Sequence, residues 1–145
     1  MKNLLNEQLR QFNYMIGEID RLYCDAALKM GLTDSALSVL YTLSAEGAPC
    51  RISDICRLTG VSKQTINSAL RRLEGDGVIL LRAVNGKQKA VELTEKGERL
   101  AKETAERLIE AENRLFEAWT DEERAEYLRL TSVYRDGLKK AIDEL

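Results

Sequence analysis

The chain has 145 residues, of which 44% are hydrophobic and 32% charged, and its formal net charge is −2. One proline and nine glycines argue against a disordered, collagen-like or proline-rich chain, and the length fits one domain with a helical extension. The absence of histidine excludes Ser–His and Cys–His catalysis, HExxH metal sites and histidine-based pH switching.

Apolar runs and cysteines constrain the compartment and the cofactor chemistry. No apolar run approaches the roughly 20 residues that cross a bilayer, and residues 1–13 lack the apolar region of a signal peptide. We therefore expect a cytoplasmic protein. Cys24, Cys50 and Cys56 form no CxxC motif, so we predict no metal site and no cofactor. Cys56 fits a small core residue, and a redox-sensing role for Cys24 stays open as an alternative.

The N-terminal third reads as two helices. Residues 4–30 carry an apolar seam at alternating spacings of four and three, which predicts a long amphipathic helix with coiled-coil character that ends at Gly31. A second helix, capped by Thr33 or Asp34, is predicted to end near Gly47. The seam consists of Leu5, Leu9, Phe12, Ile16, Ile19, Tyr23 and Ala26.

The middle of the chain fits a helix-turn-helix followed by a hairpin. A short helix over residues 52–60, with Ser53 as a candidate cap, leads through Gly60 into a helix capped by Ser62 that ends around residues 74–77. A small residue, here Cys56, lets the two helices approach closely. Residues 78–82 and 89–93 have the pattern of strands, and Asn85-Gly86 between them is a strong hairpin signal.

Two long helices are predicted to follow the hairpin. Thr94 caps one that covers residues 95–118, and Thr120 with Glu123 forms a capping box for another that reaches residue 144. The fold class is therefore mainly α. It contains a winged helix-turn-helix lobe, residues 33–94, and long N- and C-terminal helices, residues 1–30 and 95–145, within a single domain.

The distribution of charge points to nucleic acid. Residues 51–91 hold 8 basic and 3 acidic side chains, whereas residues 1–50 hold 4 and 6, and residues 92–145 hold 10 and 15. Basic charge concentrated in one lobe is typical of phosphate binding. The helix that begins at Ser62 also has no acidic residue before Glu74, and its outward positions are hydrogen-bonding side chains. The candidate DNA-binding residues are Ser62, Lys63, Gln64, Thr65, Asn67, Ser68, Arg71 and Arg72 in this helix, and Lys87 and Lys89 in the hairpin.

The chain resembles the MarR family of winged-helix transcription regulators over nearly its whole length. The matching segments are Leu32-Thr33, the stretch ISDICRLTGVSKQTINSALRRLEGDGVI over residues 52–79, and residues 93–97. The family's wing usually carries Asp-x-Arg eight residues before this second Leu-Thr pair, where the chain has Asn85 and Lys87. A lysine is a point charge without the planar fork of arginine, so the wing is expected to attract phosphates more than to select bases.

The resemblance implies a homodimer, and the apolar seams agree with it. The expected dimer interface contains Leu5, Leu9, Phe12, Ile16, Leu138 and Ile142. A two-fold dimer would place two recognition helices on a pseudo-palindromic operator of double-stranded DNA, with half-sites roughly 34 Å apart. The resemblance also implies repression and a small aromatic effector, although no residue pattern identifies its pocket.

The sequence disfavours two other classes of function. A winged helix used only for protein–protein assembly predicts acidic or apolar outward residues after Ser62, and the sequence has neither. An enzyme is not expected, because no glycine-rich phosphate loop, cysteine cluster or carboxylate constellation accompanies the absence of histidine.

Overall fold

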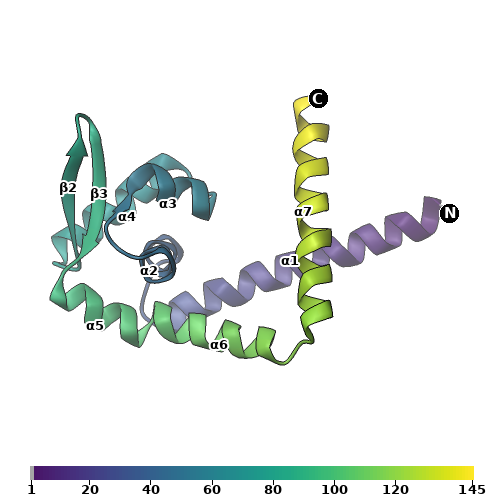
Figure 1. Cartoon of the computed structure of the whole chain (residues 1–145), viewed down its shortest axis with the longest axis horizontal. Helices are drawn as coiled ribbons and strands as arrows, with labels where there is room; N and C mark the ends of the chain where they lie inside the picture. The colour runs from purple at the N-terminus through teal and green to yellow at the C-terminus, as the bar shows by residue number, and fades with distance from the viewer. Residues whose placement is uncertain (1) are drawn as a thin grey trace. The chain divides into compact units, whose positions relative to one another are not determined.

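A computed structural model describes residues 2–145, so Met1 lies outside the described residues. The predicted mainly helical fold is confirmed, with a small antiparallel sheet beside the helices (Figure 1). The elements in chain order are α1 (Lys2–Lys29), α2 (Asp34–Glu46), β1 (Cys50–Arg51), α3 (Ile52–Thr59), α4 (Lys63–Gly75), β2 (Ile79–Asn85), β3 (Gln88–Leu93), α5 (Glu95–Glu103), α6 (Ala105–Glu117) and α7 (Asp121–Asp143).

The chain divides into two compact units, one that runs to Arg107 and one from Leu108 to Leu145. The first contains the winged lobe, whose hydrophobic core is formed by aliphatic side chains from α2, α3, α4 and the sheet. Burial of these side chains away from water is the main stabilising contribution to the lobe. The largest fully buried ones are Leu40, Leu43, Ile55, Ile66, Leu70, Ile79, Val39 and Val91.

The junction of α1 and α2 follows the sequence prediction. Gly31 adopts a left-handed φ of 69°, and the N–H of Leu32 donates to the Ala27 carbonyl at 2.9 Å, which closes the end of α1. Thr33 caps α2, since its hydroxyl oxygen accepts a hydrogen bond from the Ala36 N–H at 3.1 Å. From this junction α1 projects away from the lobe (Figure 1).

The sheet contains one strand more than the sequence predicted. Strand β3 lies in the centre and pairs antiparallel with β2 and with the two-residue β1, in the order β1-β3-β2. The β2–β3 hairpin is also longer than predicted, because pairing continues to Asn85 and Gln88. Its loop is therefore Gly86-Lys87, with Gly86 at a φ of 55° in the first loop position, where two-residue hairpins favour glycine.

The predicted single helix over residues 95–118 is wrong, because the structure breaks it at Thr104. This residue has φ −126° and ψ −90°, and its N–H bonds to the Ala101 carbonyl three residues back. The buried Thr104 hydroxyl donates to the Leu100 carbonyl at 2.6 Å. The buried Thr42 makes the same bond to the Ser38 carbonyl within the unbroken α2, so this bond accompanies the end of α5 and does not by itself explain it.

Two smaller expectations for α3 are also corrected. Ser53 does not cap this helix, because the N-cap is Arg51 and no side chain satisfies it. Cys56 is half-buried rather than a core residue, since only Ile55 of α3 is fully buried. The close packing of α3 against α4 therefore leaves one edge of Cys56 accessible.

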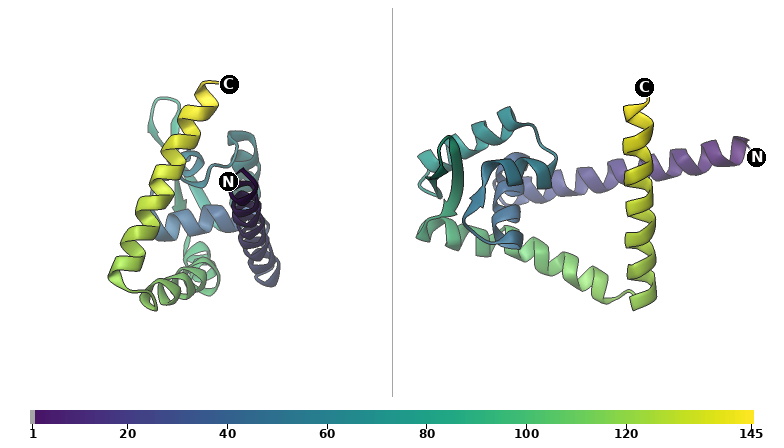
Figure 2. Two further views of the ribbon diagram at one scale, coloured as in Figure 1. Left: turned by 90° about the vertical axis from the view of Figure 1, so that its right-hand side faces the viewer. Right: turned by 45° about the horizontal axis from the view of Figure 1, so that its top comes forward.

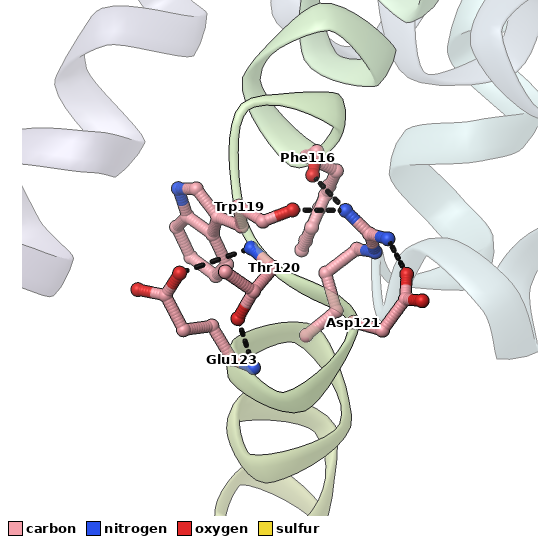
Figure 3. Close-up of polar contacts among 6 residues, drawn as sticks. Phe116, Trp119, Thr120, Asp121 and Glu123 are labelled. Atoms are coloured by element: carbon pink, nitrogen blue, oxygen red, sulfur yellow. Dashed lines mark hydrogen bonds and ion pairs between the residues drawn. The ribbon is translucent and has the colours of Figure 1, made fainter.

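The second unit is organised by the corner between α6 and α7 (Figure 3). The predicted capping box is confirmed: Thr120 N–H donates to Glu123 Oε1 at 2.9 Å, and Glu123 N–H donates to Thr120 Oγ1 at 3.1 Å. Arg124 donates to the carbonyls of Phe116 and Trp119, and it also pairs with Asp121. It thus connects the start of α7 to the end of α6, where the Phe116 carbonyl also accepts from the Trp119 N–H at 3.1 Å.

Apolar side chains of α1 and α7 remain uncovered. Within the described chain, α7 contains no buried residue. Of the residues predicted for the dimer interface, Phe12 is half-buried and the other five are between 41% and 61% exposed. Exposed apolar side chains therefore recur along both α1 and α7. Among residues 2–145, no helix is both long enough and apolar enough to cross a membrane.

Candidate nucleic-acid interface

The turn between α3 and α4 fixes how the two helices meet. Gly60 takes a left-handed φ of 68°, as predicted, and its N–H donates to the Cys56 carbonyl at 3.0 Å. The Thr59 hydroxyl donates to the Ile55 carbonyl at 2.7 Å and accepts from the Val61 N–H at 3.2 Å. The turn is therefore held by side-chain and backbone bonds together.

The start of α4 is capped by Ser62. Its hydroxyl oxygen accepts from the Thr65 N–H at 3.2 Å and lies 2.9 Å from the Thr65 hydroxyl, to which it donates. The hydroxyl of Ser62 is thus already engaged inside the helix. The N–H groups of the first turn that remain without intrahelical partners, together with Lys63, leave this end electropositive.

The side of α4 that faces away from the core is fully accessible. Ile66, Leu70 and Leu73 are buried, and the exposed Gln64, Ser68 and Arg71 lie opposite them at spacings of four and three. Of the other predicted residues in this helix, Lys63, Thr65 and Arg72 are exposed, whereas Asn67 is half-buried. The structure therefore brings most of the predicted set onto one accessible surface, with Gln64, Ser68 and Arg71 at its centre.

The hairpin stands beside α4 and carries the other predicted residues (Figure 2). Lys87 is the second loop residue and Lys89 lies on β3 opposite Ala83, and both are exposed. Lower on the hairpin, Arg82 pairs with Glu92 at 3.1 Å, so its charge is partly neutralised. The positive charge of the hairpin is concentrated at its tip.

The environment of Cys24 works against a reactive thiolate. Its Sγ donates a hydrogen bond to Asp34 Oδ2 at 3.1 Å, and this bond raises the pKa of the thiol above its ordinary value. Reactive cysteines have a lowered pKa in electropositive surroundings. The carboxylate therefore favours the protonated, less reactive form of Cys24.

A pocket of about 340 Å³ lies between α4 and the α1–α2 junction. Its lining is mainly apolar, and Arg72 provides a cation on the flank of α4 that faces this junction. The remaining lining residues are Leu28, Gly31, Leu32, Thr33, Ala36, Ala69, Leu73 and Asp76.

Sequence reasoning missed the contacts that hold the far end of α4. Lys96 Nζ donates to the Asp76 carbonyl at 2.7 Å, and Thr94 bonds to the backbone of residues 77 and 78. Thr94 was predicted only as a cap of the next helix, which it also is. No local signal connects Lys96 with a carbonyl 20 residues earlier in the chain.

These elements define a winged helix-turn-helix protein. A short helix leads through a tight glycine turn into a second helix with an exposed polar face, and a two-stranded hairpin adjoins that helix. Comparisons with known proteins agree with this class. A model of the MarR family matches residues 30–87, which run from the end of α1 to the hairpin loop. No curated protein matches the chain.

Solved structures share the fold over nearly the whole chain. A MarR family regulator from Neisseria meningitidis has a TM-score of 0.83 at 24% identity, and covers 94% of this chain and 97% of its own. MepR from S. aureus in a DNA complex has a TM-score of 0.68 at 19% identity, covering 89% and 96%. The chain is therefore similar to the MarR family over residues 30–87, and it shares the fold of solved MarR family regulators.

Proposed function

We propose that the protein is a homodimeric, sequence-specific DNA-binding transcription regulator that acts as a repressor. In this proposal α4 enters the major groove and the tip of the β2–β3 hairpin contacts the adjacent minor groove. The observation that carries it is the accessible face of α4, which presents hydrogen-bonding and cationic side chains and no acidic one before Glu74.

The side chains at the centre of this face suit direct readout of bases. Glutamine can form two hydrogen bonds with adenine, and arginine can form two with guanine, so Gln64 and Arg71 have the required chemistry. Arg71 can alternatively neutralise a phosphate, whereas Ser68 is short and suits the backbone. Asn67 also has an amide that can pair with adenine, although it is half-buried.

The hairpin is proposed to add electrostatic attraction rather than base selection. Lys87 and Lys89 place two exposed positive charges at its tip. The minor groove has an enhanced negative potential where it is narrow, and lysine satisfies that potential without the fixed geometry of arginine. The hairpin should therefore strengthen binding to many sequences about equally.

Dimerisation is supported by the uncovered apolar faces of α1 and α7. A second copy of the chain would remove Leu9 and Ile16 of α1, and Leu138 of α7, from water. The fold is shared with MepR, which has been solved in a complex with DNA. Two symmetry-related copies of α4 would then address two half-sites about one helical turn apart.

Effector release is proposed to act through the pocket beside α4. Its apolar lining suits an aromatic ring, and Arg72 can pair with a carboxylate. A small aromatic anion bound there would favour poses of α4 that do not fit the groove, provided that it binds those poses more tightly. Titration of benzoate against the protein–DNA complex tests this point, and Arg72→Gln should weaken any release that occurs.

Selection of bound fragments from random duplex DNA, using the purified full chain, tests the main proposal. We expect an enriched pseudo-palindrome with two half-sites, and an affinity that falls steeply as salt rises because phosphate contacts release counterions. A protein–protein assembly module would enrich no sequence. Selection with Gln64→Ala should relax the preference at particular base pairs, whereas Arg99→Ala, on α5, should leave the enriched sequence unchanged.

A further inference from the structure

The segment that leaves α4 is held by the first turn of α5 through three consecutive carbonyl groups. The carbonyl of Asp76 accepts from Lys96 Nζ at 2.7 Å, and that of Val78 accepts from the Thr94 N–H at 3.0 Å. The carbonyl of Gly77, between them, accepts from the Thr94 hydroxyl, which also lies 3.1 Å from the Val78 oxygen. We call this set of contacts the exit clamp.

The C-terminal end of α4, beside the exit clamp, is capped by its own backbone hydrogen bonds. Val78 N–H donates to the Leu73 carbonyl at 2.9 Å, and Gly77 N–H donates to the Glu74 carbonyl at 3.0 Å. Gly77 has a φ of 73°, so the bonds form a Schellman motif. The three clamped carbonyls therefore follow the last turn of α4 directly, and moving them would require this motif to change.

Gly97 allows the clamped segment and α5 to lie against each other. A Cβ atom at this position would overlap the carbonyl oxygen of Val78, which is backbone and cannot move aside as a side chain could. The N–H of Gly97 also donates to the Thr94 hydroxyl oxygen at 3.0 Å. Along the same helix Ala101 is fully buried, so α5 packs as part of the winged lobe over its whole length.

We infer that Thr94, Lys96 and Gly97 are positioning residues for DNA recognition: they hold the C-terminal end of α4 against α5 and so fix the pose of its outward face. The inference rests on the proposed DNA-binding function. None of the three needs to touch DNA. A recognition helix that can tilt at its C-terminal end loses conformational freedom on binding, and this entropy cost weakens the affinity. The same tilt lets the helix fit half-sites at other spacings, so the spacing preference falls.

Lys96→Met is the main test, because it removes the donor at the surface and spares the core. The full-length variant is titrated with a duplex that carries the selected half-site spacing, and with duplexes that have one base pair more or less. We expect the wild-type preference for the selected spacing to fall by about two- to tenfold, the range set by loss of one hydrogen bond. The dependence of affinity on salt should stay unchanged.

Matched variants separate positioning from charge. Lys96→Arg keeps a donor and a charge, and should restore most of the spacing preference. Lys102→Met removes the same charge from the exposed end of α5 and should behave as the wild type. A salt slope that falls by about one in Lys96→Met, with the spacing preference intact, would make Lys96 a phosphate contact and overturn the inference. Equal behaviour of Lys96→Met and wild type would overturn it as well.

A measurement without DNA keeps the inference distinct from the proposed function. Amide hydrogen exchange over residues 70–80 should become about two- to tenfold faster in Lys96→Met and in Thr94→Val, but not in Lys102→Met. Unchanged exchange in both clamp variants would show that the clamp does not hold the end of α4. If exchange changes in the clamp variants but the wild type binds no DNA, the proposed function is refuted. The role of the clamp in recognition is then refuted with it.

Discussion

The winged lobe and the terminal helices differ in how far their apolar side chains are buried within one chain. In the lobe, side chains such as Leu40, Ile66 and Val91 are completely buried within one chain. In α7 no residue is buried, and α1 exposes apolar residues along most of its length before Ala27 enters the core. The lobe thus buries its own apolar residues, whereas α1 and α7 leave most of theirs exposed to solvent.

Breaking the apolar face of α1 should have the largest effect. Leu9→Glu places a charge where we propose that a second copy packs, so sedimentation equilibrium should show monomers. Affinity for a two-half-site duplex should fall by about a hundredfold or more, because the second contact would lose its high effective concentration. Asn3→Glu, which adds the same charge to the polar side of α1, should leave the dimer intact. A dimer that persists in Leu9→Glu would contradict the assignment of this face.

Adding one methyl group in each region should change stability in opposite directions. Gly97→Ala forces a Cβ against the Val78 carbonyl and should destabilise the protein by about 1–3 kcal/mol. Gly17→Ala lies in the middle of α1 with nothing within 4 Å of its new Cβ, and should stabilise it by about 0.5–1 kcal/mol. Urea denaturation at one protein concentration compares the two. A stable Gly97→Ala protein would mean that α5 can shift away from the lobe.

Charge removal within the lobe should change how DNA binding depends on salt. Arg71→Ala and Lys87→Ala should each lower the slope of log affinity against log salt by about one, if both side chains meet phosphates. Gln64→Ala should leave the slope unchanged and cost about 1–3 kcal/mol at particular base pairs. A normal slope in Arg71→Ala, combined with a changed base preference, would move Arg71 from phosphate contact to base readout.

The smallest effect is expected at the corner between α6 and α7. Backbone and side-chain hydrogen bonds from Thr120 lower the pKa of Glu123, so the folded state favours its carboxylate. This stabilisation is complete above the ordinary glutamate pKa and is lost as pH falls through the lowered value. Thermal melts followed by circular dichroism should show that the melting temperature falls less on acidification in Glu123→Gln than in wild type. Glu122→Gln serves as the control from the same turn, and equal losses in both variants would remove Glu123 from this role.

The features that the sequence predicted well depend on a few neighbouring residues. Caps by Thr33, Ser62 and Thr120 bond within three residues of themselves, and the glycine turn at Gly60 needs only its own backbone conformation. The accessible face of α4 follows from helical periodicity once the buried side is known. These parts of the fold and of the candidate interface were therefore accessible to pattern reasoning.

The features that it missed depend on residues far apart in the chain. Strand β1 has two residues and exists because β3 pairs with it, a partner about 40 positions later. The break at Thr104 has no local signal, since the equally buried Thr42 makes the same side-chain bond within the unbroken α2. The Lys96 contact with Asp76 likewise needs the folded hairpin to bring its two ends together.

The corner of the second unit holds the chain's only tryptophan, and this gives the protein a built-in optical reporter. Trp119 stacks edge-on with Phe116 and Tyr127, at ring-centre distances of 5.0 and 5.2 Å. Its emission therefore senses the packing of that corner, while the winged lobe contributes no indole signal of its own. A change in emission when a ligand binds the lobe would be a direct record of communication between the two units, obtained without any label.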